Sequence, residues 1–283
     1  MLLMKHKTCL ITGGTSGVGK AIAIGLATQG AQVILLCRDR KKGAESADFI
    51  KRKTNNNLIH VMTANLASLD SIRFFCNDFK KQYKQLHVLS NNAAVFPMQR
   101  ETTEDGFESI FGVNYLGHFY LTYLLTELLA QSAPSRIITV SGSPGLLKNG
   151  KINLLDLQSE QSFNPFKATL QAAMAKVVFS HELADRLKNM GVTSNTFHPG
   201  LVKSRLGRRF PVVFRPLIFL GELFLREKCE TGVYLASSPA VSSISGAIFL
   251  KKQPVSFKSH YLDSSFLKKL WEESEKICGL PFR

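Results

Sequence analysis

A glycine-rich turn near the N-terminus restricts the fold of this chain more than any other feature. The sequence Thr12-Gly13-Gly14-Thr15-Ser16-Gly17-Val18-Gly19 follows a strand-like apolar run and opens a predicted helix over Lys20–Thr28. Glycines at such a turn let the backbone approach a pyrophosphate, and the amides of the helix N-terminus face that anion. Because loops collect glycine anyway, the flanking strand and helix carry the prediction of a dinucleotide-binding unit.

Short apolar runs alternate with helix-length segments along the rest of the chain. Strands are expected at Thr8–Thr12, Gln32–Cys37, Leu58–Asn65, Leu86–Asn91, Arg136–Val140, Val192–His198 and Ala247–Leu250, with helices that include 107–130, 165–190 and Glu230–Ser237. Such alternation indicates parallel strands joined by crossover helices. With 283 residues and 45% hydrophobic content, we expect an α/β fold: a single domain over 1–283, with a doubly wound parallel sheet flanked by helices.

The chain is basic, with 36 Lys and Arg against 21 Asp and Glu and a formal net charge of +15. This balance favours an anionic partner, and an acidic membrane surface or an anionic carrier protein stays open. The cations are dispersed without interleaved aromatic residues, so nucleic acid is not expected. Five scattered cysteines lack metal or redox spacing, so no metal site is expected, and we expect neither a signal sequence nor an N-terminal anchor before the first strand. We therefore expect a cytoplasmic protein.

Arg38, at the end of the second apolar run, indicates which dinucleotide the chain prefers. An acidic residue at this strand end binds the ribose 2′-hydroxyl of NAD(H), whereas an arginine pairs with the 2′-phosphate of NADP(H). The run Leu36-Cys37-Arg38-Asp39-Arg40 therefore predicts NADP(H). The alternative is a solvated basic corner that Asp39 partly neutralises.

The chain resembles the short-chain dehydrogenase/reductase family over nearly its whole length, and more closely the retinol-dehydrogenase-like branch. The family motif Thr-Gly-x-x-x-Gly-x-Gly matches residues 12–19, and Asn-Asn-Ala-Gly matches residues 91–94, with Ala94 replacing the last glycine. Residues 113–119 are similar to its central helix, with Asn114 at the catalytic asparagine. Residues 198–204 match the loop that receives the nicotinamide carboxamide, with Ser204 at the usual threonine. The resemblance implies a Rossmann-type fold and a homodimer formed through the helices at 107–130 and 165–190.

The residues predicted to bind NADP(H) come from these matched segments, together with Arg38, Asn65 and Leu66. They lie in the glycine-rich turn, at the ends of strands and in the loop after residue 198. They are Gly13, Thr15, Ser16, Gly17, Val18, Gly19, Arg38, Asn65, Leu66, Asn92, Ala93, Ala94, Pro199, Gly200, Val202 and Ser204.

The family's catalytic positions are substituted in this chain. The resemblance places a serine after the fifth strand and Tyr-x-x-x-Lys on the next helix, where a spacing of four residues puts both side chains on one face. Here Gly142 stands at the serine, Thr169 at the tyrosine and Ala173 at the lysine, and no tyrosine occurs between Tyr123 and Tyr234. In the family these groups polarise the carbonyl, donate the proton and support the donor. A non-standard active site follows.

The remaining catalytic candidates are Asn114, Ser141, Ser143 and Thr169. Either serine supplies a hydroxyl if the loop is shifted by one residue, although Ser-Gly-Ser is also ordinary turn sequence. The Thr169 hydroxyl is a far weaker acid than a phenol.

Two further groups of residues receive a packing interpretation. His118, Tyr120 and Tyr123 share a helix with Asn114, where such side chains usually pack rather than act as acids. Lys176 lies seven residues beyond Thr169, about 10 Å along the helix axis, and is expected on the surface or far from the ribose.

The segment 201–228 is an apolar insertion with cations at both ends, at the place of the family's substrate lid. As a lid it implies a lipophilic small-molecule substrate. Two alternatives stay open: an interfacial helix that contacts a membrane surface peripherally, and a helix that completes the core or a dimer contact.

Two functions are compatible with these features. One is an NADP(H)-dependent enzyme with altered chemistry, either an atypical reduction or a non-redox reaction. The other is a catalytically inactive NADP(H)-binding protein with a regulatory or scaffold role. The apolar insertion and the nicotinamide loop favour the enzyme, because a scaffold needs neither.

Overall fold

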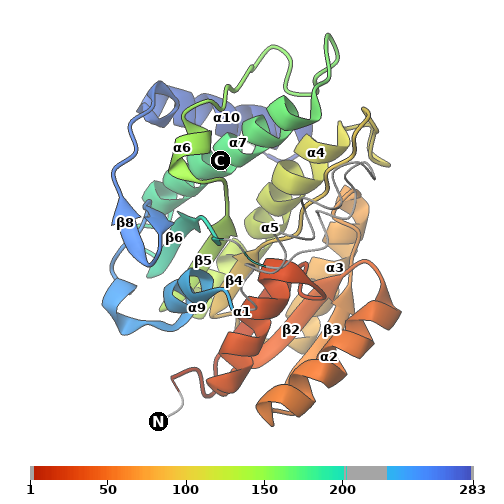
Figure 1. The fold of residues 1–283 in the computed structure, drawn as a ribbon, viewed down its shortest axis with the longest axis vertical. Helices are drawn as coiled ribbons and strands as arrows, with labels where there is room; N and C mark the ends of the chain where they lie inside the picture. Colours follow the sequence, from red (N-terminus) through yellow and green to blue (C-terminus); the bar gives the residue numbers. More distant parts are fainter. Residues whose placement is uncertain (1–2, 201, 203–227, 282–283) are drawn as a thin grey trace, which may run out of the picture.

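The computed structural model describes residues 3–200, 202 and 228–281, and in these ranges one eight-stranded sheet runs through the molecule (Figure 1). Its strands are β1 (Thr8–Thr12), β2 (Gln32–Cys37), β3 (Ile59–Thr63), β4 (Val88–Asn91), β5 (Ser135–Val140), β6 (Val192–Phe197), β7 (Ile248–Leu250) and β8 (Gln253–Val255). The order is β3-β2-β1-β4-β5-β6-β7-β8; β1 to β7 pair in parallel and β8 pairs antiparallel with β7. The expected doubly wound sheet is confirmed.

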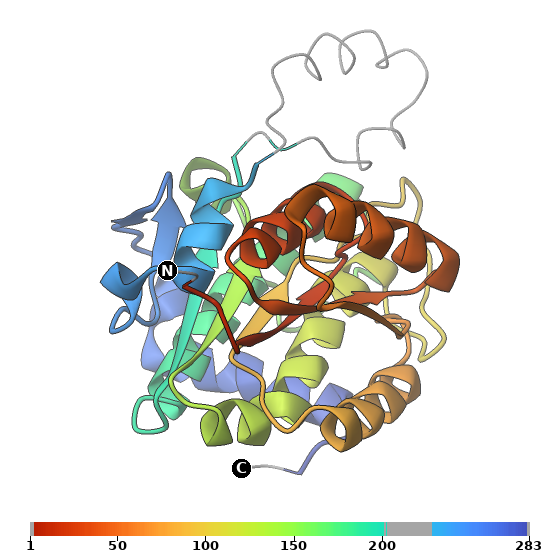
Figure 2. The same ribbon diagram turned by 90° about the horizontal axis from the view of Figure 1, so that it is seen from below.

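Helices cover both faces of this sheet. They are α1 (Gly17–Thr28), α2 (Arg40–Thr54), α3 (Leu69–Gln82), α4 (Ser109–Phe111), α5 (Gly117–Gln131), α6 (Pro144–Leu147), α7 (Pro165–Arg186), α9 (Glu230–Ser237) and α10 (Ser264–Ile277), with the π-helical turn η1 (Gly112–Leu116) and the 3₁₀ turns η4 (Pro239–Val241) and η5 (His260–Leu262). Helices α1, α2 and α9 pack together on one face, and α3, α5 and α7 lie on the other, as Figure 2 shows for α1 and α2 against α3 and α5. Helix α10 packs against α7.

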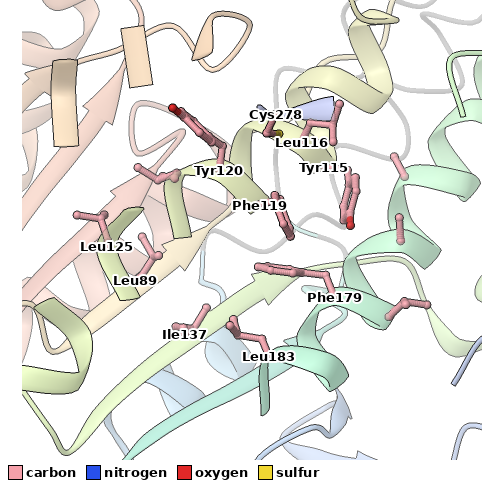
Figure 3. Close-up of a cluster of buried hydrophobic side chains, with 14 of the residues drawn as sticks. Leu89, Tyr115, Leu116, Phe119, Tyr120, Leu125, Ile137, Phe179, Leu183 and Cys278 are labelled. Atoms are coloured by element: carbon pink, nitrogen blue, oxygen red, sulfur yellow. The ribbon is translucent and has the colours of Figure 1, made fainter. Parts of the chain in front are cut away.

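Successive side chains along the strands pack into two separate apolar cores, one on each face of the sheet. Leu10 and Ile34 belong to the core under α3, α5 and α7, whereas their neighbours Ile11 and Leu35 belong to the core under α1, α2 and α9. Parallel strands covered on both faces are apolar at nearly every position, which explains why β1 and β2 stand out in the sequence. Figure 3 shows the first core, where Phe119 and Phe179 meet between α5 and α7.

The structure departs from the sequence expectations at a few element ends. The predicted helix 107–130 is interrupted by η1, and the predicted helix 165–190 ends at Arg186. Strand β8 was not predicted, because the hairpin before it turns through Lys251 and Lys252 with φ of 49° and 67°. Two-residue hairpins with positive φ normally signal themselves by asparagine or glycine. The predicted lid at 201–228 lies outside the described residues apart from Val202 and Lys228.

Candidate functional site

The candidate site lies where the strand order reverses, between β1 and β4. In doubly wound sheets the carboxyl ends of two such strands form the crevice in which dinucleotides bind. The turns after these strands touch: the Thr12 hydroxyl oxygen accepts the backbone N–H groups of Asn92 (2.8 Å) and Ala93 (3.0 Å). A Cβ on Gly13 would lie 3.0 Å from the Ala93 Cα, so this approach requires glycine.

The glycine-rich turn forms a cradle that larger residues would fill. Gly13 and Gly17 have φ of 64° and 55°, in the left-handed region that favours glycine. A Cβ on Gly19 would lie 2.6 Å from the carbonyl oxygen of Gly13. Ser16 precedes helix α1 without a side-chain capping bond, which leaves first-turn amides for another acceptor. The cradle therefore fits the pyrophosphate of a dinucleotide.

Other predicted cofactor residues in the first half of the chain lie in this turn or follow β3 and β4. The Thr15 carbonyl accepts the Ser46 hydroxyl at 3.3 Å, which ties the turn to α2. Asn65 follows β3, and its side-chain nitrogen Nδ2 donates to a carboxylate oxygen of Glu104 at 2.8 Å. Val18, Leu66 and Ala94 are partly or fully accessible. Ala94 lacks the positive φ that would demand glycine, so alanine is compatible with this position.

The predicted nicotinamide loop follows β6. Pro199 and Gly200 are partly and fully exposed, and Gly200 has a φ of 76°. Val202 is buried and its N–H bonds the Gly200 carbonyl at 3.2 Å. Ser204 lies outside the described residues.

Arg38 lies beside the cradle at the end of β2. It is exposed and forms no ion pair with the part of the chain that the structure describes. Asp39 is occupied elsewhere: it accepts the Lys42 N–H at 3.1 Å as the N-cap of α2, and it pairs with the Lys42 ammonium at 2.8 Å. The hydrogen bonds from Lys42 lower the pKa of the Asp39 carboxyl. Asp39 thus supports α2, and Arg38 is left to meet a solvent-side anion.

The three positions predicted to replace the family's catalytic groups lie close together. A Cβ on Gly142 would be 3.9 Å from the Cβ of Ala173 and 3.4 Å from the side chain of Leu147. Thr169 lies one turn before Ala173 on α7. Its hydroxyl oxygen is sealed from solvent and has no hydrogen-bond partner among the described residues. Gly142 and Ala173 therefore face each other without polar side chains, and the Thr169 hydroxyl beside them is buried.

Ser141 and Ser143 use their hydroxyls structurally. The Ser141 hydroxyl donates to the Ala173 backbone carbonyl at 2.8 Å and is buried. The Ser143 hydroxyl accepts the Leu146 N–H at 3.4 Å as the N-cap of α6. The Ser141 proton is therefore engaged by the Ala173 carbonyl, whereas the half-buried Ser143 hydroxyl accepts its bond and keeps its own proton available to donate.

Asn114 lies in η1 and joins this helix to the loop after β4. Its side-chain oxygen accepts the Val95 N–H at 2.8 Å, and its side-chain nitrogen donates to the Val95 carbonyl at 3.1 Å. The His118 Nδ1 lies 3.2 Å from the Asn114 carbonyl and therefore donates, so its Nε2 accepts from the Thr12 hydroxyl at 2.9 Å. Burial, with the nearby charge of Lys176, lowers the pKa of His118 to about 3. His118 is therefore a neutral structural link and not an acid at neutral pH.

The tyrosines near Asn114 point into the core or toward the C-terminus. Tyr115 shares a 2.8 Å hydrogen bond with the Ser274 hydroxyl, and Tyr123 donates to the Pro281 carbonyl at 3.4 Å. Figure 3 shows the hydroxyls of Tyr115 and Tyr120 at opposite ends of the cluster. The packing interpretation of these side chains agrees with the structure.

Lys176 is the residue that the sequence interpretation misplaced. It is only 8% exposed, so the expectation of a surface position is wrong. Helix α7 packs against β6, α10, α4 and η1, and every residue from 171 to 180 is buried. Burial lowers the pKa of Lys176 to about 8. A single lysine in the run Met174-Ala175-Lys176-Val177-Val178-Phe179 was the signal available in the sequence.

Apolar side chains surround the carboxyl ends of β4 and β5. Phe96 and Phe166 meet edge to face, with ring centroids 5.4 Å apart. Phe166 begins α7 one turn before Thr169 and is 55% exposed, and Leu146 on α6 is 54% exposed. Large exposed apolar groups beside a site indicate contact with an apolar ligand or surface.

Other site types find no support in residues 3–200, 202 and 228–281. No group of three or more His, Cys, Asp or Glu side chains is arranged there to hold a metal ion. No helix in these ranges combines the length and apolar character that crossing a bilayer requires. All five cysteines are buried free thiols.

Comparisons with known proteins agree with this geometry. A family profile described as short chain dehydrogenase matches residues 7–154. Retinol dehydrogenase 14 of Homo sapiens is 42% identical over 98% of this chain and 88% of its own length, and retinol dehydrogenase 12 of Homo sapiens is 38% identical over 97% and 87%. A crystal structure of an uncharacterized protein from Mycobacterium paratuberculosis superposes with a TM-score of 0.76 at 29% identity, covering 99% of this chain and 96% of that one.

The fold, the crevice at the switch point and these matches lead to one assignment. The doubly wound parallel sheet agrees with the fold that the resemblance implied, and the relatives align along almost the whole chain. The chain belongs to the short-chain dehydrogenase/reductase family, in its retinol-dehydrogenase-like branch.

Proposed function

We propose that the chain binds NADP(H) and acts on a lipophilic small molecule by reduction that does not use the family's tyrosine acid. The observation that carries this proposal is the pairing of an intact dinucleotide cradle with the side-chain-free contact between Gly142 and Ala173. The cradle supports binding, and the missing groups support altered chemistry. The family itself binds nicotinamide cofactors.

Different segments of the chain bind different parts of the cofactor. The glycine-rich turn accommodates the pyrophosphate, and Arg38 pairs with the 2′-phosphate because Asp39 is already held by Lys42. The loop with Pro199 and Gly200 receives the nicotinamide end. When bound, the reduced cofactor supplies hydride.

The substrate class follows from the rim of the site and from the relatives. Phe166 and Leu146 present exposed apolar side chains near Thr169, and Phe166 packs on the buried Phe96. The relatives are named retinol dehydrogenases, after a lipophilic alcohol. Without a phenol, reduction is easiest at a conjugated carbon–carbon double bond or an iminium carbon. Such acceptors need less help at oxygen than a ketone does.

Calorimetry with NADPH and NADH tests binding, and a panel of lipophilic enones, iminium compounds and carbonyl compounds tests chemistry. We expect tighter binding of NADPH and cofactor oxidation only with the first two classes. Equal affinity for both cofactors contradicts the NADP(H) assignment. Fast turnover of simple carbonyl compounds contradicts the altered chemistry.

A second candidate is an NADP(H)-binding protein with no catalytic activity. The structural use of the Ser141 hydroxyl favours it, because the nearest replacement for the missing serine is already engaged. Binding of NADPH without oxidation by any panel member, and without formation of any product, would select this candidate. For either candidate we propose a cytoplasmic protein that forms a homodimer and contacts a membrane surface peripherally. The buried free thiols are compatible with a reducing compartment.

A further inference from the structure

Lys176 is a buried cation for which the described residues provide no counterion. It is 8% exposed, and it makes no hydrogen bond or ion pair with residues 3–200, 202 or 228–281. Burying an unpaired ammonium opposes folding strongly, whereas an apolar side chain would suit this helix face. A lysine at such a position indicates that a bound ligand provides the hydrogen-bond partner of its ammonium.

The backbone position of Lys176 directs it toward the empty lysine position. It follows Ala173 by three residues, so the two are neighbours on the surface of α7. Helical side chains lean toward the helix N-terminus, which brings the Lys176 side chain back toward the level of Ala173. Gly142 and Ala173 face each other there without the serine and lysine side chains that the resemblance implies, and a Cβ on Gly142 would lie 3.9 Å from the Ala173 Cβ.

Lys176 lies close enough to His118 for its charge to act on that imidazole. The positive charge contributes, after burial, to the lowered pKa of His118. His118 bonds the Thr12 hydroxyl at the end of β1 and the Asn114 carbonyl in η1. Lys176 therefore carries its charge close to the two elements that frame the candidate site.

We propose that Lys176 replaces the lysine missing at position 173, and that its ammonium donates hydrogen bonds to the hydroxyls of the nicotinamide ribose of bound NADP(H). An ammonium has three donors and no acceptor, so ribose hydroxyl oxygens are suitable partners. The assignment rests on the proposed cofactor. It gives a binding role to a position outside the family's catalytic motif, one turn further along α7.

The test compares two ligands by calorimetry. NADPH contains the nicotinamide ribose, whereas 2′,5′-ADP carries the adenosine half and its 2′-phosphate but lacks that ribose. Lys176→Met should weaken NADPH binding about 10- to 100-fold, the range for a lost hydrogen bond to a charged group, and leave 2′,5′-ADP unchanged. Lys188→Met, an exposed lysine just beyond the end of α7, is the matched control and should change neither affinity.

A rescue variant and a chemical measurement make the test independent of any one substitution. Ala173→Lys combined with Lys176→Met returns the cation to the family position and should recover most of the NADPH affinity. In the unmodified protein, NADPH should protect Lys176 from reductive methylation, followed by mass spectrometry, and 2′,5′-ADP should not.

The outcomes distinguish a failure of the Lys176 assignment from a failure of the proposed cofactor. NADPH affinity unchanged in Lys176→Met, or methylation of Lys176 unaffected by NADPH, overturns the assignment of Lys176 and leaves the proposed cofactor standing. No measurable binding of NADPH to the unmodified protein overturns both. An equal loss for NADPH and 2′,5′-ADP shows a general structural effect and also rejects the assignment.

Discussion

The Ser141 hydroxyl donates a 2.8 Å hydrogen bond to the backbone carbonyl of Ala173, which fastens the end of β5 to the middle of α7. This bond holds Gly142 opposite Ala173. The two positions predicted to correspond to the family's serine and lysine are thus held together by a contact that involves neither of their side chains.

Ser141→Ala tests whether this hydroxyl is structural. Removing one buried hydrogen bond should lower the free energy of unfolding by about 0.5–1.5 kcal/mol, measured by urea denaturation. Ser143→Ala, whose capping bond is longer at 3.4 Å, should cost less. NADPH affinity should be the same in both variants and the native protein. A stable Ser141→Ala protein that loses turnover would instead identify Ser141 as catalytic.

Arg38→Ala tests the cofactor preference. Loss of a charge-assisted contact to the 2′-phosphate should weaken NADPH binding by about 1–3 kcal/mol and barely affect NADH. Because Asp39 is held by Lys42, Asp39→Asn should leave the discrimination between the two cofactors largely intact. Native affinities that are equal for NADPH and NADH would refute the role of Arg38.

Simple ketones, aldehydes and retinal should be reduced negligibly. A positioned acid contributes about 10²–10⁴ in rate, and neither Thr169 nor Ala173 can take that part. Cofactor oxidation measured against an ordinary family member tests this expectation. Comparable turnover that survives substitution of Thr169, Ser141 and Ser143 would show that the aligned helix register or the mechanistic inference is wrong.

The burial of Lys176 should be visible in the pH dependence of stability. Its pKa is lowered from 10.5 to about 8, so between these values the folded protein binds fewer protons at this site than the unfolded chain does. The free energy of unfolding should therefore rise with pH through this window, as far as Lys176 contributes. Lys176→Met removes the contribution. The stability advantage of that variant over the native protein, from urea unfolding, should be largest below pH 8 and shrink above it.

Restoring the family's groups tests the register directly. Gly142→Ser, Thr169→Tyr and Ala173→Lys together should produce some NADPH-linked carbonyl reduction, and the new serine meets only ordinary contact with Leu147 at 3.4 Å. Adding Lys176→Met should increase the gain, because two ammonium groups would otherwise compete for one space. In a cofactor-bound crystal, the new tyrosine hydroxyl and lysine ammonium should both point to the nicotinamide ribose. Side chains that face solvent or the core would reject the register.

The sequence predicted those parts of the fold that depend on local pattern. The bounds of β1, β2 and α9 are confirmed residue for residue, because buried parallel strands are continuous apolar runs and α9 is flanked by clear breaks. The hairpin before β8 was missed because Lys251 and Lys252 adopt positive φ without the usual residue types. The glycine cradle was predicted because glycine there has a steric reason that the structure shows at Gly13 and Gly19.

The site was less predictable where burial depends on distant elements. Helical phase places Lys176 near the face of Thr169, but its burial comes from packing against other elements far along the chain. Likewise the Ser141 hydroxyl bonds the Ala173 carbonyl, 32 residues away in the sequence. No local sequence pattern predicts this hydrogen bond. Neutral His118 follows from its burial and from the charge of Lys176 on another helix, which the sequence around His118 does not reveal.

The π-helical turn Gly112–Leu116 makes the candidate site sensitive to the number of residues in this turn. Such a turn accommodates one residue more than an α-helical turn, and each residue advances a helix by about 100°. Deleting one residue there would leave helix α5 intact yet rotate Asn114 and His118 out of phase with each other. Val95 and Thr12 would lose their partners together. A single deletion could thus dismantle the crevice while sparing the helix that frames it.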